Sequence, residues 1–315
     1  MGRQFYRTNR RPYQGGAAVT SFNEQAFAFE VTDKQVTGIL HPALEPRSGT
    51  GLLIIVGGPQ YRIGAHRQYV HLARHCAKGG FPVMRFDYRG IGDSEGDYPG
   101  FRSVEPDVHR AIDEFLARDK KINNVVIWGL CEGASACLLG AQKHPAVSGL
   151  VLVNPWVRSE AGLAKAYVKH YYTDRLKDPE LWKKLFSGKM NLGGAIGGFL
   201  GNFKKAFSGK PAAGNGEPYS QPEEITEENF PEKMLEGLQG FTGRVLLVQS
   251  EVDMVAREFD DLVRGSRDWK AAFEEKDFTR RDIAGSDHTF SSEPWRKAVA
   301  EATLDWLAGS RKAGK

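Results

Sequence analysis

The chain has 315 residues, of which 41% are hydrophobic and 26% charged, and its 43 basic and 39 acidic side chains give a formal net charge of +4. These proportions are typical of a globular protein with a sizeable core, and they exclude a disordered, collagen-like or disulfide-scaffold chain. With no apolar run of about 18 residues, three cysteines and only mild basicity, the sequence predicts a cytoplasmic protein without a membrane-spanning helix or a nucleic-acid partner.

The N-terminal part predicts a tail followed by three strands. Residues 1–20 are polar and rich in arginine, and no apolar stretch follows their positive charges. We therefore expect a mobile tail and not a secretory signal. Short β-rich patterns predict strands over residues 26–31, 35–41 and 52–56. The third of these is apolar throughout and lies between glycines, which is typical of a strand buried on both faces of a sheet.

Predicted helices and strands then alternate along the chain. The pattern predicts helices over residues 66–78, 104–118 and 134–143, and strands over residues 82–88, 124–128 and 147–154. Strands that are separated by helices of 10–15 residues imply right-handed crossovers and a mostly parallel, doubly wound α/β sheet.

One long segment interrupts this alternation. Residues 158–240 contain helical and glycine-rich stretches without a strand pattern, and they predict a helical lid or cap insertion. The alternation resumes with a strand at 244–249, a helix at 258–275, a strand at 277–283 and a helix at 294–307. The expected organisation is therefore a core in two parts, 21–157 and 241–309, with a short tail at 310–315.

Two segments match the pattern Gly-x-nucleophile-x-Gly, in which a strand turns sharply into a helix and exposes the nucleophile. Residues 92–96 carry Ser94 at the centre, and residues 129–133 carry Cys131. Cys131 directly follows a predicted strand and precedes a predicted helix, whereas Ser94 lies several residues beyond its strand and before a turn. We predict that Cys131 is the nucleophile; the alternative is a small packing residue in an inactive relative.

A cysteine at this turn has a clear chemical use. A free thiol has a pKa of about 8.5, and a helix N-terminus or a paired histidine lowers it so that thiolate is present at neutral pH. A thiolate attacks acyl carbons and forms a thioester that water or another acceptor can open. Cys76 and Cys137 lie inside predicted helices, and we expect them to be packing residues.

The nucleophile needs a histidine base, which follows the acid in the chain order typical of such sites. His288 is the predicted base because it lies in the loop after the last predicted strand. Five of the competing histidines lie on earlier helices or in the insertion, where solvated or capping roles are expected: His66, His71, His75, His109 and His170.

The acid that orients this histidine is expected after the strand at 244–249. Glu251 and Asp253 both follow it, and we favour Asp253 because the turn must leave the strand end before it presents a short carboxylate. The position after the preceding strand carries Asn154 and so offers no carboxylate. Asp287 is adjacent to the histidine in sequence, so its side chain is expected to point away.

An oxyanion hole needs two N–H donors directed at the developing negative charge. The first predicted donor is the backbone N–H of Glu132, the residue after the nucleophile. The second is expected in residues 57–60, where Pro59 has no N–H. Gly58 and Gln60 both stay open as the second donor.

Together these motifs resemble the α/β-hydrolase superfamily over residues 21–157 and 241–309. The blocks GLLIIVGGPQYRIGAHRQYVHLAR, FPVMRFDYRGIGDSEG and VVIWGLCEGASA are more specifically similar to exosortase A system-associated hydrolases of the hydrolase 1 type. Those are bacterial proteins encoded with exopolysaccharide and protein-sorting systems. The resemblance implies Cys131 as nucleophile, Asp253 as acid and His288 as base. It departs from most hydrolases in the cysteine and in GGPQ where HGGP or HG is common.

The resulting expectation is an acyl hydrolase that cleaves an ester or thioester through an acyl-enzyme on Cys131. An acyltransferase would use the same intermediate, and a non-catalytic binding protein would keep the fold alone. No phosphate-binding glycine motif and no metal-ligand cluster occurs in the sequence, so we expect neither a cofactor nor a metal.

The insertion carries a strong positive charge. Residues 158–210 contain eleven Lys or Arg and four acidic residues, an excess of seven positive charges. This segment is interpreted either as a solubilising lid face or as a basic rim that attracts an anionic small-molecule acyl substrate, such as an acyl-CoA, an acyl carrier or an acidic saccharide. Residues 193–207 place apolar residues before lysines, which raises a weaker hypothesis of contact with a membrane surface.

Overall fold

The structure is a computed structural model that describes residues 23–43, 45–46, 49–58, 60–157 and 224–309. The predicted tails at 1–20 and 310–315 lie outside these ranges. The basic segment at 158–210 and the candidate membrane-contact segment at 193–207 also lie outside them. The interpretations of the basic segment and the hypothesis of membrane contact therefore stay predictions.

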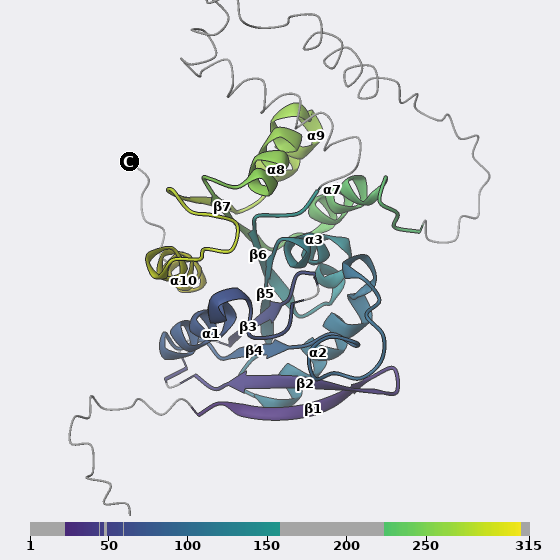
Figure 1. Cartoon of the computed structure of the whole chain (residues 1–315), viewed down its shortest axis with the longest axis vertical. Helices are drawn as coiled ribbons and strands as arrows, with labels where there is room; N and C mark the ends of the chain where they lie inside the picture. Colours follow the sequence, from purple (N-terminus) through teal and green to yellow (C-terminus); the bar gives the residue numbers. More distant parts are fainter. Residues whose placement is uncertain (1–22, 44, 47–48, 59, 158–223, 310–315) are drawn as a thin grey trace, which may run out of the picture.

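A single eight-stranded sheet forms the centre of the described part (Figure 1). The strands lie in the order β1-β2-β4-β3-β5-β6-β7-β8. The pairings of β2 with β1 and with β4 are antiparallel, and all the others are parallel. Their bounds are β1 Gln25–Val31, β2 Lys34–His41, β3 Thr50–Ile55, β4 Val83–Phe86, β5 Asn124–Leu130, β6 Val147–Val153, β7 Arg244–Ser250 and β8 Phe278–Ile283. This mostly parallel sheet confirms the predicted fold class.

Helices cover both faces of the sheet. Helices α1 and α10 pack together on one side, and α2, α3 and α7 lie on the other (Figure 1). The α-helices are α1 Gln68–Lys78, α2 Glu105–Arg118, α3 Glu132–Leu139, α7 Phe230–Gly240, α8 Met254–Gly265, α9 Arg267–Glu274 and α10 Glu293–Leu307. Short 3₁₀ turns occur at η1 Ala65–Arg67, η2 Phe101–Ser103 and η3 Ala141–Lys143.

The central strands are apolar because both of their faces are covered. In β3, all residues from Gly51 to Ile55 are buried, as the continuous apolar run predicted. Strand β5 presents Trp128, which is 2% exposed and whose ring packs edge-on against Tyr69 of α1 at a centroid distance of 5.6 Å. This rigid centre fixes the carboxyl ends of β3 and β5, where the sequence places the reactive groups.

Two predicted helices have different bounds. The single helix predicted over 258–275 is wrong, since α8 ends at Gly265 and α9 begins after Ser266. The break has a local cause: glycine disfavours helix continuation, and the Ser266 hydroxyl accepts a hydrogen bond from the Trp269 N–H at 3.3 Å as an N-cap. The helix predicted to begin at residue 134 begins at Glu132, because the chain turns into α3 directly after Cys131.

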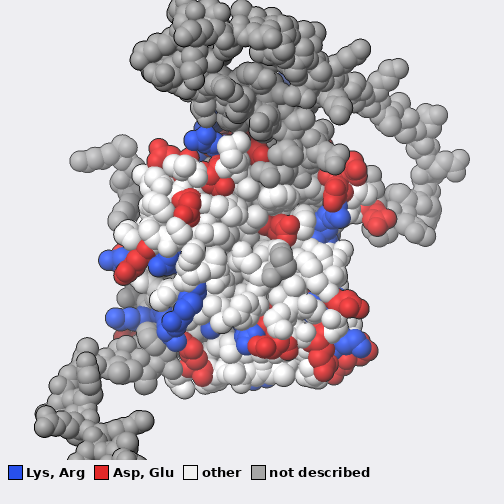
Figure 2. Space-filling model, viewed as in Figure 1, with Lys and Arg blue, Asp and Glu red and all other residues white. Residues whose placement is uncertain are grey.

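Charge on the visible face of the described residues is mixed. Acidic and basic side chains lie intermixed there, mostly toward its edges (Figure 2). None of the helices that the described ranges contain has both the length and the apolar character needed to cross a membrane.

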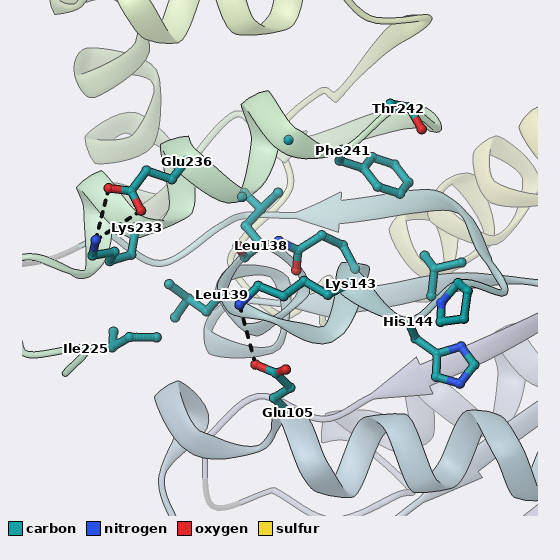
Figure 3. Close-up of a pocket in the computed structure, with 15 residues that line it drawn as sticks. Glu105, Leu138, Leu139, Lys143, His144, Ile225, Lys233, Glu236, Phe241 and Thr242 are labelled. Carbon is teal, nitrogen blue, oxygen red and sulfur yellow. Dashed lines mark hydrogen bonds and ion pairs between the residues drawn. The ribbon is translucent and has the colours of Figure 1, made fainter. Parts of the chain in front are cut away.

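A cavity of about 680 Å³ lies between α3, η3 and α7 (Figure 3). Its walls include two ion pairs, Lys143 with Glu105 at 3.8 Å and Lys233 with Glu236 at 3.0 Å. The α3 residues that line it, Leu138 and Leu139, lie at the C-terminal end of that helix, so the cavity is separate from the turn at the N-terminus of α3.

Candidate active site

Cys131 occupies a strained turn between β5 and α3. Its backbone has φ 58° and ψ −123°, and α3 begins at the next residue. A positive φ is rare for a residue with a side chain and is typical of functional turns. The N–H of Cys131 donates to the carbonyl of Val153 at 2.9 Å, which ties the turn to the end of β6. The side chain is partly exposed at the carboxyl edge of the sheet.

The two flanking glycines are required by close packing. A Cβ on Gly129 would lie 2.4 Å from the carbonyl carbon of Gly133, and a Cβ on Gly133 would lie 2.9 Å from the carbonyl oxygen of Ile55. Neither distance is tolerated, so only glycine allows the turn to fold back on β5 and β3. This is the physical reason for the Gly-x-Cys-x-Gly pattern.

The rival serine has a different location. The Ser94 hydroxyl donates to the carbonyl of Asp87 at 3.1 Å and accepts from the N–H of Thr37 at 3.0 Å. Ser94 therefore joins the turn after β4 to β2 and does not lie at a strand-to-helix turn.

The other two cysteines are part of the core. Cys76 and Cys137 are completely buried, and burial raises the pKa of both thiols well above the ordinary value. Both groups are thus held in the neutral, unreactive form, as expected for packing residues.

The structure brings Asp253 and His288 together. Asp253 follows β7 and caps α8, because its carboxylate accepts from the N–H groups of Val255 and Ala256, each at 3.2 Å. Its Oδ2 also lies 2.8 Å from Nδ1 of His288. Glu251 instead accepts from the N–H of Gly285 at 2.6 Å, so it supports the loop that carries the histidine.

His288 lies between Asp253 and Cys131. Burial lowers its pKa, but hydrogen bonding to Asp253 and to Cys131, together with their charges, raises the pKa of His288 to about 10. The surroundings therefore favour the imidazolium form of His288. Asp287 points away as predicted, since it binds the N–H of Ser291 at 2.9 Å.

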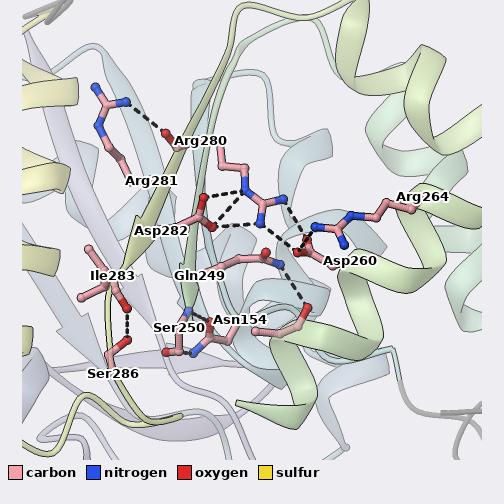
Figure 4. A network of polar contacts seen from close by, with 11 residues as sticks. Asn154, Gln249, Ser250, Asp260, Arg264, Arg280, Arg281, Asp282, Ile283 and Ser286 are labelled. Atoms are coloured by element: carbon pink, nitrogen blue, oxygen red, sulfur yellow. Dashed lines mark hydrogen bonds and ion pairs between the residues drawn. The ribbon is translucent and has the colours of Figure 1, made fainter. Parts of the chain in front are cut away.

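Two residues that the sequence analysis did not identify hold the histidine loop. Asn154, directly after β6, donates from Nδ2 to the Ser250 hydroxyl at 2.8 Å (Figure 4) and to the carbonyl of His288 at 3.1 Å. Ser250, at the end of β7, donates in turn to the carbonyl of Asp287 at 2.8 Å. Both are fully or almost fully buried. Their signal in the sequence is a polar residue directly after a buried apolar strand.

The predicted oxyanion loop packs against the same turn. A Cβ on Gly57 would lie 2.3 Å from the carbonyl oxygen of Leu130 and 3.3 Å from the backbone nitrogen of Glu132. Gly58 follows with φ +60° and lies beside the Glu132 side chain. The buried side-chain oxygen of Gln60 has no hydrogen-bond partner among the described residues. Of the two open candidates, Gly58 is therefore the one that the contacts place next to Glu132.

Comparisons with known proteins agree with this fold. A family model described as serine aminopeptidase, S33, matches residues 52–183. The matched range includes the turn at Cys131 but neither Asp253 nor His288. No curated protein matches the sequence.

Several solved structures are similar to the chain. An esterase from Pyrococcus furiosus has a TM-score of 0.58 at 15% identity, and the match covers 91% of each chain. Est1E from Butyrivibrio proteoclasticus, solved with ferulic acid, has a TM-score of 0.56 at 14% identity over 90% of this chain and 99% of that one. A dienelactone hydrolase from Anabaena variabilis has a TM-score of 0.55 at 13% identity over 91% and 98%.

The sheet order, the sharp turn after β5 and these structural relatives establish the α/β-hydrolase fold. On these grounds the chain has the α/β-hydrolase fold, and over residues 52–183 it is similar to the family described as serine aminopeptidase, S33.

Proposed function

We propose that this protein is an acyl hydrolase of ester or thioester bonds, with Cys131 as nucleophile, His288 as acid–base and Asp253 as the orienting acid. The observation that carries the proposal is the line from Asp253 through the His288 ring, 2.8 Å away, to the thiol at the strained turn. Each group is supplied by a different strand end, so the sheet itself fixes their order in space.

In the first step, the Cys131 thiolate attacks the acyl carbon and a C–S bond forms while the carbonyl electrons move to oxygen. The oxyanion is held by the backbone N–H groups of Glu132 and Gly58, and one such donor is worth about 3–4 kcal/mol of the activation barrier. The oxyanion then collapses, the bond to the leaving alcohol or thiol breaks, and His288 gives its proton to the leaving group.

In the second step, water opens the thioester on Cys131. Neutral His288 accepts a proton from the water as its oxygen attacks, and the same two N–H groups hold the second oxyanion. Breaking the C–S bond releases the acid and restores the thiolate and imidazolium. The Asp253 carboxylate keeps the ring in the tautomer that both proton transfers need.

Transfer to an amine or hydroxyl in place of water would turn the same intermediate into an acyltransferase reaction. The resemblance to exosortase-associated hydrolases supports a natural substrate from exopolysaccharide or protein-sorting systems. The positive charge of residues 158–210 supports an anionic carrier on the leaving-group side, such as acyl-CoA or an acyl carrier.

The test is intact-protein mass spectrometry after exposure to a panel of acyl-CoA thioesters and activated esters. We expect an acyl adduct that accumulates in His288→Ala, disappears in Cys131→Ala, and turns over to free acid in the wild type. Adduct formation that persists in Cys131→Ala contradicts the nucleophile. Acyl products on added amines or alcohols, with little free acid, assign the transferase reaction instead.

A further inference from the structure

The side chain of Glu132 lies against one of the two oxyanion donors. A Cβ built on Gly58 would be 3.2 Å from Oε2 of Glu132, so the carboxylate folds back over the loop after β3. Burial raises the pKa of Glu132, and the backbone of Gly58 opposes that rise by stabilising the charged carboxylate. Gly58, whose N–H is expected to hold the substrate oxyanion, therefore lies beside a carboxyl group.

Two other polar side chains near the Glu132 carboxyl group form a second site that can bind it. Tyr98 and Arg102 lie on the segment that leads into η2 and through it, and η2 packs against α3. The Tyr98 hydroxyl and Nη1 of Arg102 are buried and have no hydrogen-bond partner among the described residues. Both lie within electrostatic range of Glu132. Buried donors without a partner are rare, because such a group loses its hydrogen bonds to water and gains none in the protein.

An ionised Glu132 carboxylate beside Gly58 is incompatible with a substrate oxyanion at the Gly58 N–H. Burial raises the pKa of Glu132, while the Gly58 N–H and the Arg102 charge oppose that rise. An ionised carboxylate and a substrate oxyanion at one N–H repel each other strongly in a half-buried site. The carboxylate must leave Gly58, or take up a proton, before an oxyanion can form there.

We propose that the Glu132 carboxylate caps the Gly58 N–H in the resting enzyme and moves to the Tyr98 hydroxyl and Arg102 guanidinium when an acyl carbonyl enters. Glu132 is then a positioning residue through which substrate binding assembles the oxyanion hole. It also disfavours acyl groups that carry a negative charge close to the carbonyl. This inference rests on the proposed function.

The probe is an alkyl trifluoromethyl ketone, whose carbonyl carbon forms a bond to the Cys131 sulfur. The carbonyl electrons move to oxygen, no group leaves, and the product is an anionic hemithioketal that ¹⁹F NMR detects directly. In Glu132→Gln the amide can still accept from the Gly58 N–H but carries no charge. We expect this variant to bind the ketone at least tenfold more tightly than the wild type at pH 8, and the difference to shrink as the pH falls and Glu132 becomes protonated.

A double-mutant cycle separates this role from a structural one. Tyr98→Phe and Arg102→Met each remove one of the groups that would bind the displaced Glu132 carboxylate. Each should therefore weaken binding of the ketone by about threefold to tenfold when Glu132 is unchanged. Neither should change it by more than about twofold in the Glu132→Gln background, where no carboxylate has to move. Glu105→Gln is the matched control, since it removes one negative charge beside Gly140 at the other end of α3.

Equal binding by the wild type and Glu132→Gln, or equal losses from Tyr98→Phe in both backgrounds, overturns the inference and leaves the proposed function intact. Absence of a hemithioketal signal in the wild type overturns the proposed function, and the inference with it. Cys131→Ala gives the baseline, because it cannot form the adduct.

Discussion

The Oδ2 atom of Asp253 is 2.8 Å from Nδ1 of His288, although 35 residues separate them in the chain. Asp253 is 8% exposed and its carboxylate also caps α8, so the position of the carboxylate does not depend on His288. A partner held in this way orients the imidazole without ordering a second mobile side chain. The geometry of the proposed triad is thus built into the end of β7.

Asp253→Asn should lower kcat for an activated ester by about 10²–10⁴-fold, because the amide favours the wrong histidine tautomer and does not stabilise imidazolium. Steady-state kinetics measures this loss. Glu251→Gln is the matched control, since that carboxylate binds the Gly285 N–H and does not reach the ring. Equal losses in both variants would contradict the assignment of the acid.

The raised pKa of His288 predicts a specific pH dependence of stability. Because the folded value, about 10, lies above the ordinary 6.5, the folded state binds the proton more tightly than the unfolded state. The stabilisation is therefore complete below about pH 6.5 and is lost as the pH rises through 10. Denaturant midpoints from pH 6 to 10 should fall in the wild type and fall less in His288→Gln.

His41 predicts the opposite trend at acid pH. Burial and the charge of Arg85 lower the pKa of His41 to about 3, and its Nε2 accepts from Nε of Arg85 at 2.9 Å. The unfolded state then binds the extra proton, so stability is present above about pH 6.5 and is lost as the pH falls toward 3. Thermal melts of His41→Gln should show a smaller loss between pH 7 and pH 4 than the wild type. A steeper loss in the variant would disprove the assignment.

Ser94→Ala separates the two nucleophile motifs. Ser94 makes two hydrogen bonds that join the turn after β4 to β2, so we expect the free energy of unfolding to fall by about 1–2 kcal/mol. Hydrolysis of an ester by the folded protein should be unchanged. Urea denaturation and an activity assay together decide the point, and loss of activity without loss of stability would favour Ser94 as the nucleophile.

Asn154→Ala tests the support of the histidine loop. The change removes the amide that binds the Ser250 hydroxyl and the His288 carbonyl. We expect kcat to fall about tenfold or more with a smaller change in KM, since the ring loses its position and the substrate contacts are unaltered. Asn154→Asp keeps the oxygen that accepts from the Ser250 N–H at 2.8 Å but loses the Nδ2 donor. It should recover part of the lost kcat only if that hydrogen bond contributes more than the two that Nδ2 donates.

The order of elements and the separate residues of the site could be predicted because both depend on local patterns. Apolar runs identify β3 and β5, and the two glycines around Cys131 identify the sharp turn. The roles of Asn154 and Ser250 could not be predicted, since their partners lie 96 residues apart and on a third segment. The contact of Glu132 with Gly58 likewise depends on how two strand ends meet.

The hydrogen bonds between Asn154 and Ser250 have a consequence for how this chain can diversify. They join the ends of β6 and β7, two neighbouring parallel strands that residues 154–243 separate in the sequence. The loop that carries His288 is consequently held by the ends of these two strands. Substitutions within residues 158–223 are therefore expected to leave the position of the His288 loop unchanged.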